Sequence, residues 1–268
     1  MVACFKKPHL EIIRDATSKG RIEKSPRFEF VVEETETRQH NLAVLKQLKR
    51  RQEWLQFLCW ALGAGAIAGF TLFSPSAIAT LPPFSWLLGK LQTVSQRVTL
   101  MEALIEAFQK EGVKIYSGLD LEGAREIDFF IAFPDKEFLL IQIRSLGNSK
   151  VFYNERTEAL QFIRKGGGLK SWEPDPLVEL AVQEKTLRKT RRDLFGGSSK
   201  DQRRPLAKLL VLWNETKLGY HSEQLYDTIE EEKILTIRKV GTTAIIEDRQ
   251  AIEFIQAYLA YRRSLKAL

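Results

Sequence analysis

Three polar side chains, Asp128, Gln142 and Arg144, stand within two otherwise apolar stretches of the sequence. Burying an aspartate destabilises the fold unless its carboxylate gains a partner or a metal ion. Residues two apart in a strand point to one face, so Gln142 and Arg144 are predicted to lie on the same face. Together the three side chains could form a chemical site. In the simpler alternative, Asp128 only forms an ion pair with Arg125 or Arg144.

The stretches that carry these residues are predicted to pair as a β-hairpin. Residues 126–133 and 137–144 each have the composition of a strand, and the turn sequence Pro-Asp-Lys joins them at residues 134–136. A helix is predicted before them at residues 98–110, where apolar residues recur at helical spacing. Gly112 is suited to end that helix.

The same patterns predict the elements that surround the hairpin. Strands are expected at residues 113–116, 206–213, 234–238 and 243–246, and helices at residues 154–165, 175–195 and 248–263. The apolar run at residues 206–213 is typical of a strand covered on both faces. The core order is α-β-β-β-α-β, which predicts an α/β domain with a mixed sheet.

This order, with Asp128 on the second strand and Gln142-x-Arg144 on the third, resembles the core of the restriction-endonuclease-like, PD-(D/E)xK nucleases. The resemblance covers roughly residues 99–213. It implies that an acid on the first helix, Glu102 or Glu106, binds Mg²⁺ together with Asp128 and Gln142. The implied catalytic residues are Glu102, Asp128, Gln142 and Arg144.

The sequence departs from the family pattern at two positions. Gln142 stands where most members have an acid, and its neutral carbonyl oxygen is a weaker Mg²⁺ ligand, although some members use glutamine. Arg144 stands where the family has a lysine. It keeps the positive charge, which could stabilise a phosphate, but it serves poorly as a base because an arginine stays protonated.

A basic segment follows the predicted helix at residues 175–195. Residues 185–204 contain eight Lys or Arg and two acids, within a chain of net charge +7. The segment could bind a nucleic acid backbone or an anionic lipid, or it could be a solvated insertion. The predicted nucleic-acid-binding residues are Lys185, Arg188, Lys189, Arg191, Arg192, Arg203 and Arg204.

A run of 36 residues without a charged side chain, residues 54–89, predicts a membrane anchor. Twenty helical residues rise about 30 Å, which matches the hydrocarbon thickness of a bilayer. Pro82 and Pro83 are expected to interrupt any second helix. Lys and Arg on both flanks favour a hairpin, with the following domain in the cytoplasm, over a single span. The alternative is a buried helix of a soluble protein.

The predicted organisation therefore has three parts. Residues 1–53 form an arm with a juxtamembrane helix capped by Asn41, residues 54–89 form the anchor, and residues 90–268 form the restriction-endonuclease-like domain. Two cysteines and three histidines, without a local cluster, give no transition-metal site built from sequence neighbours.

The sequence thus predicts a membrane-anchored protein, in contact with membrane lipid, whose nuclease-like domain binds DNA or RNA. Gln142 and Arg144 leave open whether the domain also cleaves nucleic acid with Mg²⁺. One alternative is an inactive nuclease-like scaffold that docks a protein partner at the membrane. Another is a fold unrelated to nucleases.

Overall fold

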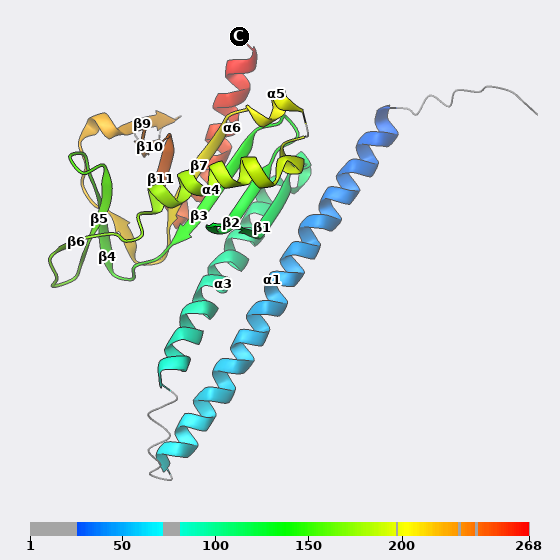
Figure 1. The fold of residues 1–268 in the computed structure, drawn as a ribbon. Coiled ribbons are helices and arrows are strands. Elements are labelled where there is room, and N and C mark those ends of the chain that lie inside the picture. The colour runs from blue at the N-terminus through cyan, green and yellow to red at the C-terminus, as the bar shows by residue number, and fades with distance from the viewer. Residues whose placement is uncertain (1–25, 72–80, 197, 230–231, 239–240, 268) are drawn as a thin grey trace, which may run out of the picture.

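The computed structural model describes residues 26–71, 81–196, 198–229, 232–238 and 241–267. Two long helices, α1 (Pro26–Thr71) and α3 (Leu81–Phe108), lie side by side and extend beyond the sheets (Figure 1). They run antiparallel, because Lys49 contacts Glu102 whereas the later residue Gln52 contacts the earlier residue Ser95. This helix pair is the most extended part of the molecule.

A mixed seven-stranded sheet lies at the centre of the fold, in the order β1-β2-β3-β7-β11-β10-β9. The strands are β1 (Lys114–Leu121), β2 (Ala124–Ala132), β3 (Phe138–Arg144), β7 (Leu206–Leu212), β9 (Tyr226–Ile229), β10 (Glu232–Ile237) and β11 (Thr243–Glu247). β1, β2 and β3 are antiparallel neighbours, and β3, β7 and β11 run parallel. The predicted hairpin is confirmed as β2 and β3, with Phe129 opposite Ile141.

Helices cover both faces of this sheet. α1, α3 and α6 (Ala251–Ala267) pack on one face, in a core that includes Met101 and Phe129. α4 (Pro176–Thr190) connects β3 to β7 and covers the other face, in a core that includes Phe130 and Leu180. Short helices complete the chain: η1 (Gln109–Glu111), η2 (Arg192–Phe195), α5 (Ser199–Gln202), η3 (Glu223–Leu225) and η4 (Asp248–Gln250). The fold is therefore mixed α/β, as predicted.

A second, four-stranded sheet has the order β6-β5-β4-β8. Its strands are β4 (Ser149–Asn154), β5 (Ala159–Arg164), β6 (Leu169–Ser171) and β8 (Thr216–Leu218). The helix predicted at residues 154–165 is wrong, because these residues form the turn after β4 and the strand β5. Leu160 is fully buried and Phe162 packs on Trp172, so tertiary contacts override the local helix preference.

Helix α1 covers the edge of the large sheet. Asn41 donates to the carbonyl of Val113 at 2.7 Å and accepts the backbone N–H of Ile115 at 3.0 Å. His40 contributes a further hydrogen bond to the carbonyl of Ile115 at 3.2 Å. The predicted role of Asn41 as a helix cap is wrong, since α1 begins at Pro26. Asn41 instead satisfies backbone groups of an edge strand, which protects that edge from pairing with other chains.

The predicted membrane anchor is also wrong. Within the described part of the chain, no helix combines the length and the apolar character that a membrane crossing requires. The uncharged run is divided between α1 and α3, and residues 72–80 lie outside the described residues. Leu55 and Leu87 pack inward, whereas Trp54, Phe57 and Trp60 are exposed, so helix packing accounts for only part of the apolar pattern. The predicted membrane localisation, which rested on the anchor, is corrected with it.

The helices also cross both predicted domain boundaries. α1 continues without a break through residues 53 and 54, and α3 continues through residues 89 and 90. Pro82 and Pro83 lie in the first turn of α3, where a proline sacrifices no intrahelical hydrogen bond. They therefore accompany the start of the helix, contrary to the predicted interruption.

Candidate functional site

Asp128 lies on β2, where the pairing of β2 with β3 ends. The last pair on this side is Phe129 with Ile141. Beyond it, Oδ2 of Asp128 accepts the backbone N–H of Ile143 at 2.7 Å, so the carboxylate takes the place of a backbone acceptor. Oδ1 accepts two hydrogen bonds from Arg97, from Nε at 2.9 Å and from Nη2 at 2.6 Å. Asp128 is 3% exposed, and protein donors occupy both its oxygens.

Arg97 on α3 is the principal partner of Asp128, and sequence reasoning did not find it. Its side chain is buried, and Nη1 donates to Oε1 of Glu126 at 2.7 Å. Burial favours a lower pKa for Arg97, but Asp128 and Glu126 outweigh it and raise the pKa above its ordinary value. The sequence did contain a signal, because Val94 and Val98 place Arg97 on the apolar side of the helix.

Glu179, in the first turn of α4, joins the other predicted residues. Its Oε2 accepts hydrogen bonds from Nε2 of Gln142 at 3.0 Å and from Nη2 of Arg144 at 2.6 Å. Its Oε1 lies 3.5 Å from Nη1 of Arg125. The first turn of a helix favours a carboxylate electrostatically, because the helix dipole is positive there. Gln142 and Arg144 share a partner, as expected of side chains on one face of β3.

Arg144 connects the two halves of the site. Its Nη1 lies 3.6 Å from Oδ2 of Asp128 and donates to the carbonyl of Ile143. Burial lowers the pKa of Arg144, against the opposing charges of Asp128 and Glu179. The result is a continuous arginine–carboxylate network, formed by Arg97, Arg125, Arg144, Glu126, Asp128 and Glu179.

Glu102 is not part of this network. It forms an ion pair with Lys49 at 2.6 Å, and about half of each side chain is exposed. Five residues separate Arg97 from Glu102, which turns their side chains about 140° apart around the helix axis. Glu106 is exposed as well. The prediction that the first helix supplies an acid to the site is therefore corrected, because α3 supplies an arginine instead.

The side chains at this place do not fit a magnesium ion. Both oxygens of Asp128 are used by Arg97 and Ile143, which leaves Oε1 of Gln142, a neutral and weak Mg²⁺ ligand, as the oxygen of this pair of residues that has no partner among the described residues. Two buried guanidinium groups would also repel a divalent cation. Among the described residues, no group of three or more His, Cys, Asp or Glu side chains could hold a metal ion.

A cleft of about 550 Å³ opens beside the network, between the helix pair and the start of β2. We call it the cationic cleft, and it is lined by Arg51, Ser85, Trp86, Gly89, Lys90, Thr93, Val94, Arg97, Arg125 and Glu126. Four of these side chains are cations and one is a carboxylate, so the lining carries a net charge of about +3 (four minus one). The cleft was not predicted, because its residues come from three distant segments.

The charge of the cleft acts on Glu126. Burial favours a higher pKa for Glu126, but the hydrogen bond and charge of Arg97 hold the pKa below its ordinary value. Arg51 and Lys90 lower it further through charge alone. Lys90 also lies over the ring of Trp86, 5.6 Å from the centroid, and Trp86 is 65% exposed. The cleft therefore combines excess positive charge with an accessible aromatic surface.

Known protein families, curated proteins and solved structures were compared with this chain, and none of them matches it. Function is therefore inferred from the geometry of the charged regions.

Much of the predicted basic segment serves the fold. Arg188 donates to the carbonyls of Gln202 at 2.6 Å and Arg204 at 3.0 Å, and it lies over the ring of Phe195. Arg204 pairs with Asp201 at 2.9 Å, and Arg191 pairs with Asp193. The cations of the segment that remain exposed are Lys185, Lys189, Arg192, Lys200 and Arg203. Those five are the cations of the segment that a ligand could contact.

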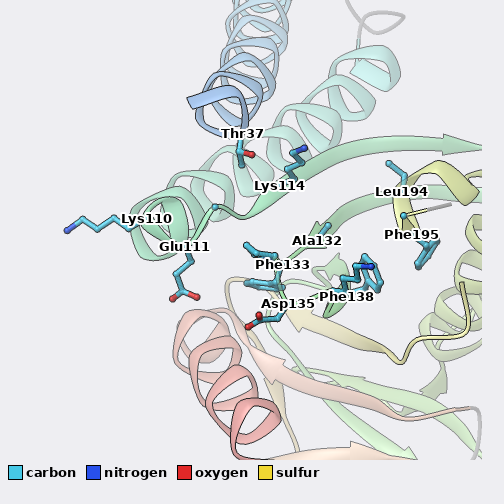
Figure 2. Close-up of a pocket in the computed structure, with 14 residues that line it drawn as sticks. Thr37, Lys110, Glu111, Lys114, Ala132, Phe133, Asp135, Phe138, Leu194 and Phe195 are labelled. Carbon is cyan, nitrogen blue, oxygen red and sulfur yellow. The ribbon is translucent and has the colours of Figure 1, made fainter. Parts of the chain in front are cut away.

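A second cavity, of about 540 Å³, lies at the other end of β2. Figure 2 shows its apolar lining, in which Phe133, Phe138 and Leu194 come from different elements. Charges at its rim are partly neutralised inside the protein, since Glu111 pairs with Arg263 and Lys136 pairs with Asp201. Three lysines and two acids line this cavity, so its lining has a net charge of about +1 (three minus two), less than that of the cationic cleft.

Proposed function

We propose that this chain has a restriction-endonuclease-like domain that binds nucleic acid, and that the cationic cleft holds the phosphate backbone. The order α3, β1, β2, β3, α4, β7, with β4, β5 and β6 inserted between β3 and α4, supports the resemblance, as does the mixed pairing of its strands. The cleft adjoins the nuclease motif through Arg97, which lines the cleft and donates two hydrogen bonds to Asp128. A phosphate-binding surface beside these positions is consistent with a nuclease-like domain.

The observation that carries the proposal is the unbalanced positive charge of the cleft. Acids of the network pair with Arg97 and Arg125, whereas Arg51 and Lys90 form no ion pair within the described chain. Phosphate groups that pair with such cations release condensed counterions, which is the main source of non-specific nucleic acid affinity. A protein partner would have to supply a dense acidic patch to match this lining.

We further propose that the domain binds nucleic acid without cleaving it. Arg97 and Arg144 neutralise Asp128, and neither arginine can act as a base at neutral pH. Gln142 donates its amide to Glu179, which leaves that carboxylate shared among three donors. In these contacts guanidinium and amide donors hold Asp128 and Glu179, which opposes the use of either acid to activate water.

The test is a binding measurement on the full chain by fluorescence anisotropy, with labelled DNA and RNA, as a function of salt. Binding should weaken steeply as salt rises, and Arg51→Ala with Lys90→Ala should weaken it further. Lys185→Ala with Lys189→Ala removes the same charge from α4 and serves as the matched control. If only the α4 variant weakens binding, the cleft is not the site.

Incubation with DNA and RNA plus Mg²⁺ or Mn²⁺ tests the proposal that the domain does not cleave nucleic acid. We expect no cleavage by the wild-type chain. Metal-dependent cleavage that disappears in Asp128→Asn would contradict the proposal that the domain only binds nucleic acid. It would favour the nuclease activity that the family resemblance implies. A folded sample that binds no nucleic acid would favour the inactive scaffold that docks a protein partner.

A further inference from the structure

We infer that the cationic cleft takes single-stranded nucleic acid, with one unpaired base stacked on Trp86. This inference rests on the proposed function and specifies its substrate class. It is carried by the position of Trp86 inside the cleft, between cations from α1, α3 and β2.

Packing within the protein does not account for the exposed position of Trp86. The adjacent Leu87 is 4% exposed and belongs to the packed side of α3, whereas Trp86 is 65% exposed. An indole ring offers a large, rigid surface on which any base can stack, and this contact tolerates all sequences because every base has a π-face. A tryptophan set among phosphate-binding cations is therefore suited to a nucleotide.

Lys90 places a cation next to that stacking surface. It lies one helical turn after Trp86, with its ammonium 5.6 Å from the centroid of the ring. A base that stacks on Trp86 brings its own phosphate close to Lys90. Arg51 and Arg125 lie on other walls of the same cleft and are positioned for neighbouring phosphates. The pattern of one aromatic ring among several cations is that of single-strand binding.

The size of the cleft favours a single strand over a duplex. Its volume of about 550 Å³ falls in the range of small-molecule sites, which accommodates individual nucleotides. In a duplex the faces of the bases are covered by their neighbours, so an indole at a cleft wall can reach only a base that is out of the stack. A duplex could still contact the outer cations, but it could not use Trp86.

Gly89 provides an independent probe of occupancy. It lines the cleft, and a Cβ atom added at this position would meet no other atom within 4 Å. A Cβ atom here would therefore occupy open space on the cleft side of α3, and a longer side chain would start from that position. Replacing a glycine inside a helix also favours the helix, so reduced binding by such a variant would not come from unfolding.

The experiment measures binding of the full chain to a labelled oligo-dT strand, a single-stranded RNA and a DNA duplex of equal length. We expect the single strands to bind at least about tenfold more tightly than the duplex. Trp86→Ala should weaken single-strand binding by between about 5-fold and about 150-fold, the range measured for one stacked base, and leave duplex binding unchanged. Trp86→Phe should retain most of the affinity, and Gly89→Leu should reduce it.

Trp60→Ala is the matched control, because Trp60 is 80% exposed on α1 and does not line the cleft. Equal affinity for single strands and duplex, or no effect of Trp86→Ala, would overturn this inference. If Arg51→Ala with Lys90→Ala still weakened binding in that case, the proposed phosphate site would stand. A chain that binds none of the three nucleic acids would overturn both.

Discussion

Two charged regions meet at Arg97 and Glu126, and they differ in how their charges are balanced. The arginine–carboxylate network matches three arginines with three acids, and Asp128 and Arg97 in it are almost fully buried. The cationic cleft adds Arg51 and Lys90 without adding a further acid. One region is neutral and internal, and the other is positive and open to a ligand.

The difference indicates that the network stabilises the fold and that the cleft binds a ligand. A buried charge is tolerated only when it is paired and hydrogen-bonded. The network joins α3, β2, β3 and α4, so removing any one of its charged side chains should destabilise the fold. An exposed cation is solvated and contributes little to folding, which leaves it available for an anion. The comparison predicts that network variants change stability, whereas cleft variants change binding.

The largest effect is expected from Asp128→Ala. Removing this carboxylate leaves Arg97 buried with only Glu126 as a partner and leaves the N–H of Ile143 unpaired. The free energy of unfolding should fall by about 3–5 kcal/mol, measured by urea denaturation. Glu102→Ala, which breaks an exposed ion pair, should change it by less than about 1 kcal/mol. Similar decreases for the two variants would contradict the distinction.

The second-largest expected effect is on the binding of nucleic acid to the cationic cleft. Arg51→Ala with Lys90→Ala should reduce the affinity for single-stranded nucleic acid and make the dependence of log K on log salt less steep, by about 0.7 for each phosphate that the variant no longer neutralises. The free energy of unfolding should remain within about 0.5 kcal/mol of wild type, because both side chains are exposed. A large decrease in stability would place these residues in the network instead.

Gln142→Met distinguishes a structural from a chemical role for Gln142. The substitution conserves volume, removes one hydrogen bond to Glu179 and eliminates a buried Oε1 that has no partner among the described residues. Stability should stay within about 1.5 kcal/mol of wild type, measured by urea denaturation, and nucleic acid binding should be unchanged. Strongly weakened binding would show that the Gln142 amide itself contacts the ligand.

The smallest expected effect is a pH dependence of stability that arises from His221, which belongs to neither charged region. Its Nε2 accepts the N–H of Tyr153 at 2.9 Å, so the ring is neutral with its proton on Nδ1, directed at the carbonyl of Gly219. Burial lowers the pKa of His221, against the opposing effects of that carbonyl and of Glu155. The unfolded histidine therefore takes up a proton at a higher pH than the folded one.

Stability from His221 should be complete above about pH 6.5 and should decrease as the pH falls below it. Urea denaturation between pH 5 and pH 8 measures this slope, and His221→Gln should reduce it while keeping an acceptor for Tyr153. An identical slope in the variant would show that another group titrates.

Much of the domain could be predicted because its signals are local. The β2–β3 hairpin follows from two apolar strands around a turn, in which the N–H of Lys136 donates to the carbonyl of Phe133. The shared face of Gln142 and Arg144 follows from the two-residue period of a strand. The segment at residues 154–165 was wrongly predicted as a helix, because its strand is selected by pairing and burial within the second sheet.

The sequence by itself determined the α/β order, the hairpin and the polar residues of β2 and β3, since each depends on neighbours along the chain. Only the tertiary structure decided what those polar residues contact. Arg97 reaches Asp128 across 31 residues, and Glu179 reaches Arg144 across 35. The tertiary structure also placed Leu55 and Leu87 of the uncharged run against protein. The sequence alone does not separate a lipid environment from a protein core, because both stabilise apolar side chains by removing them from water.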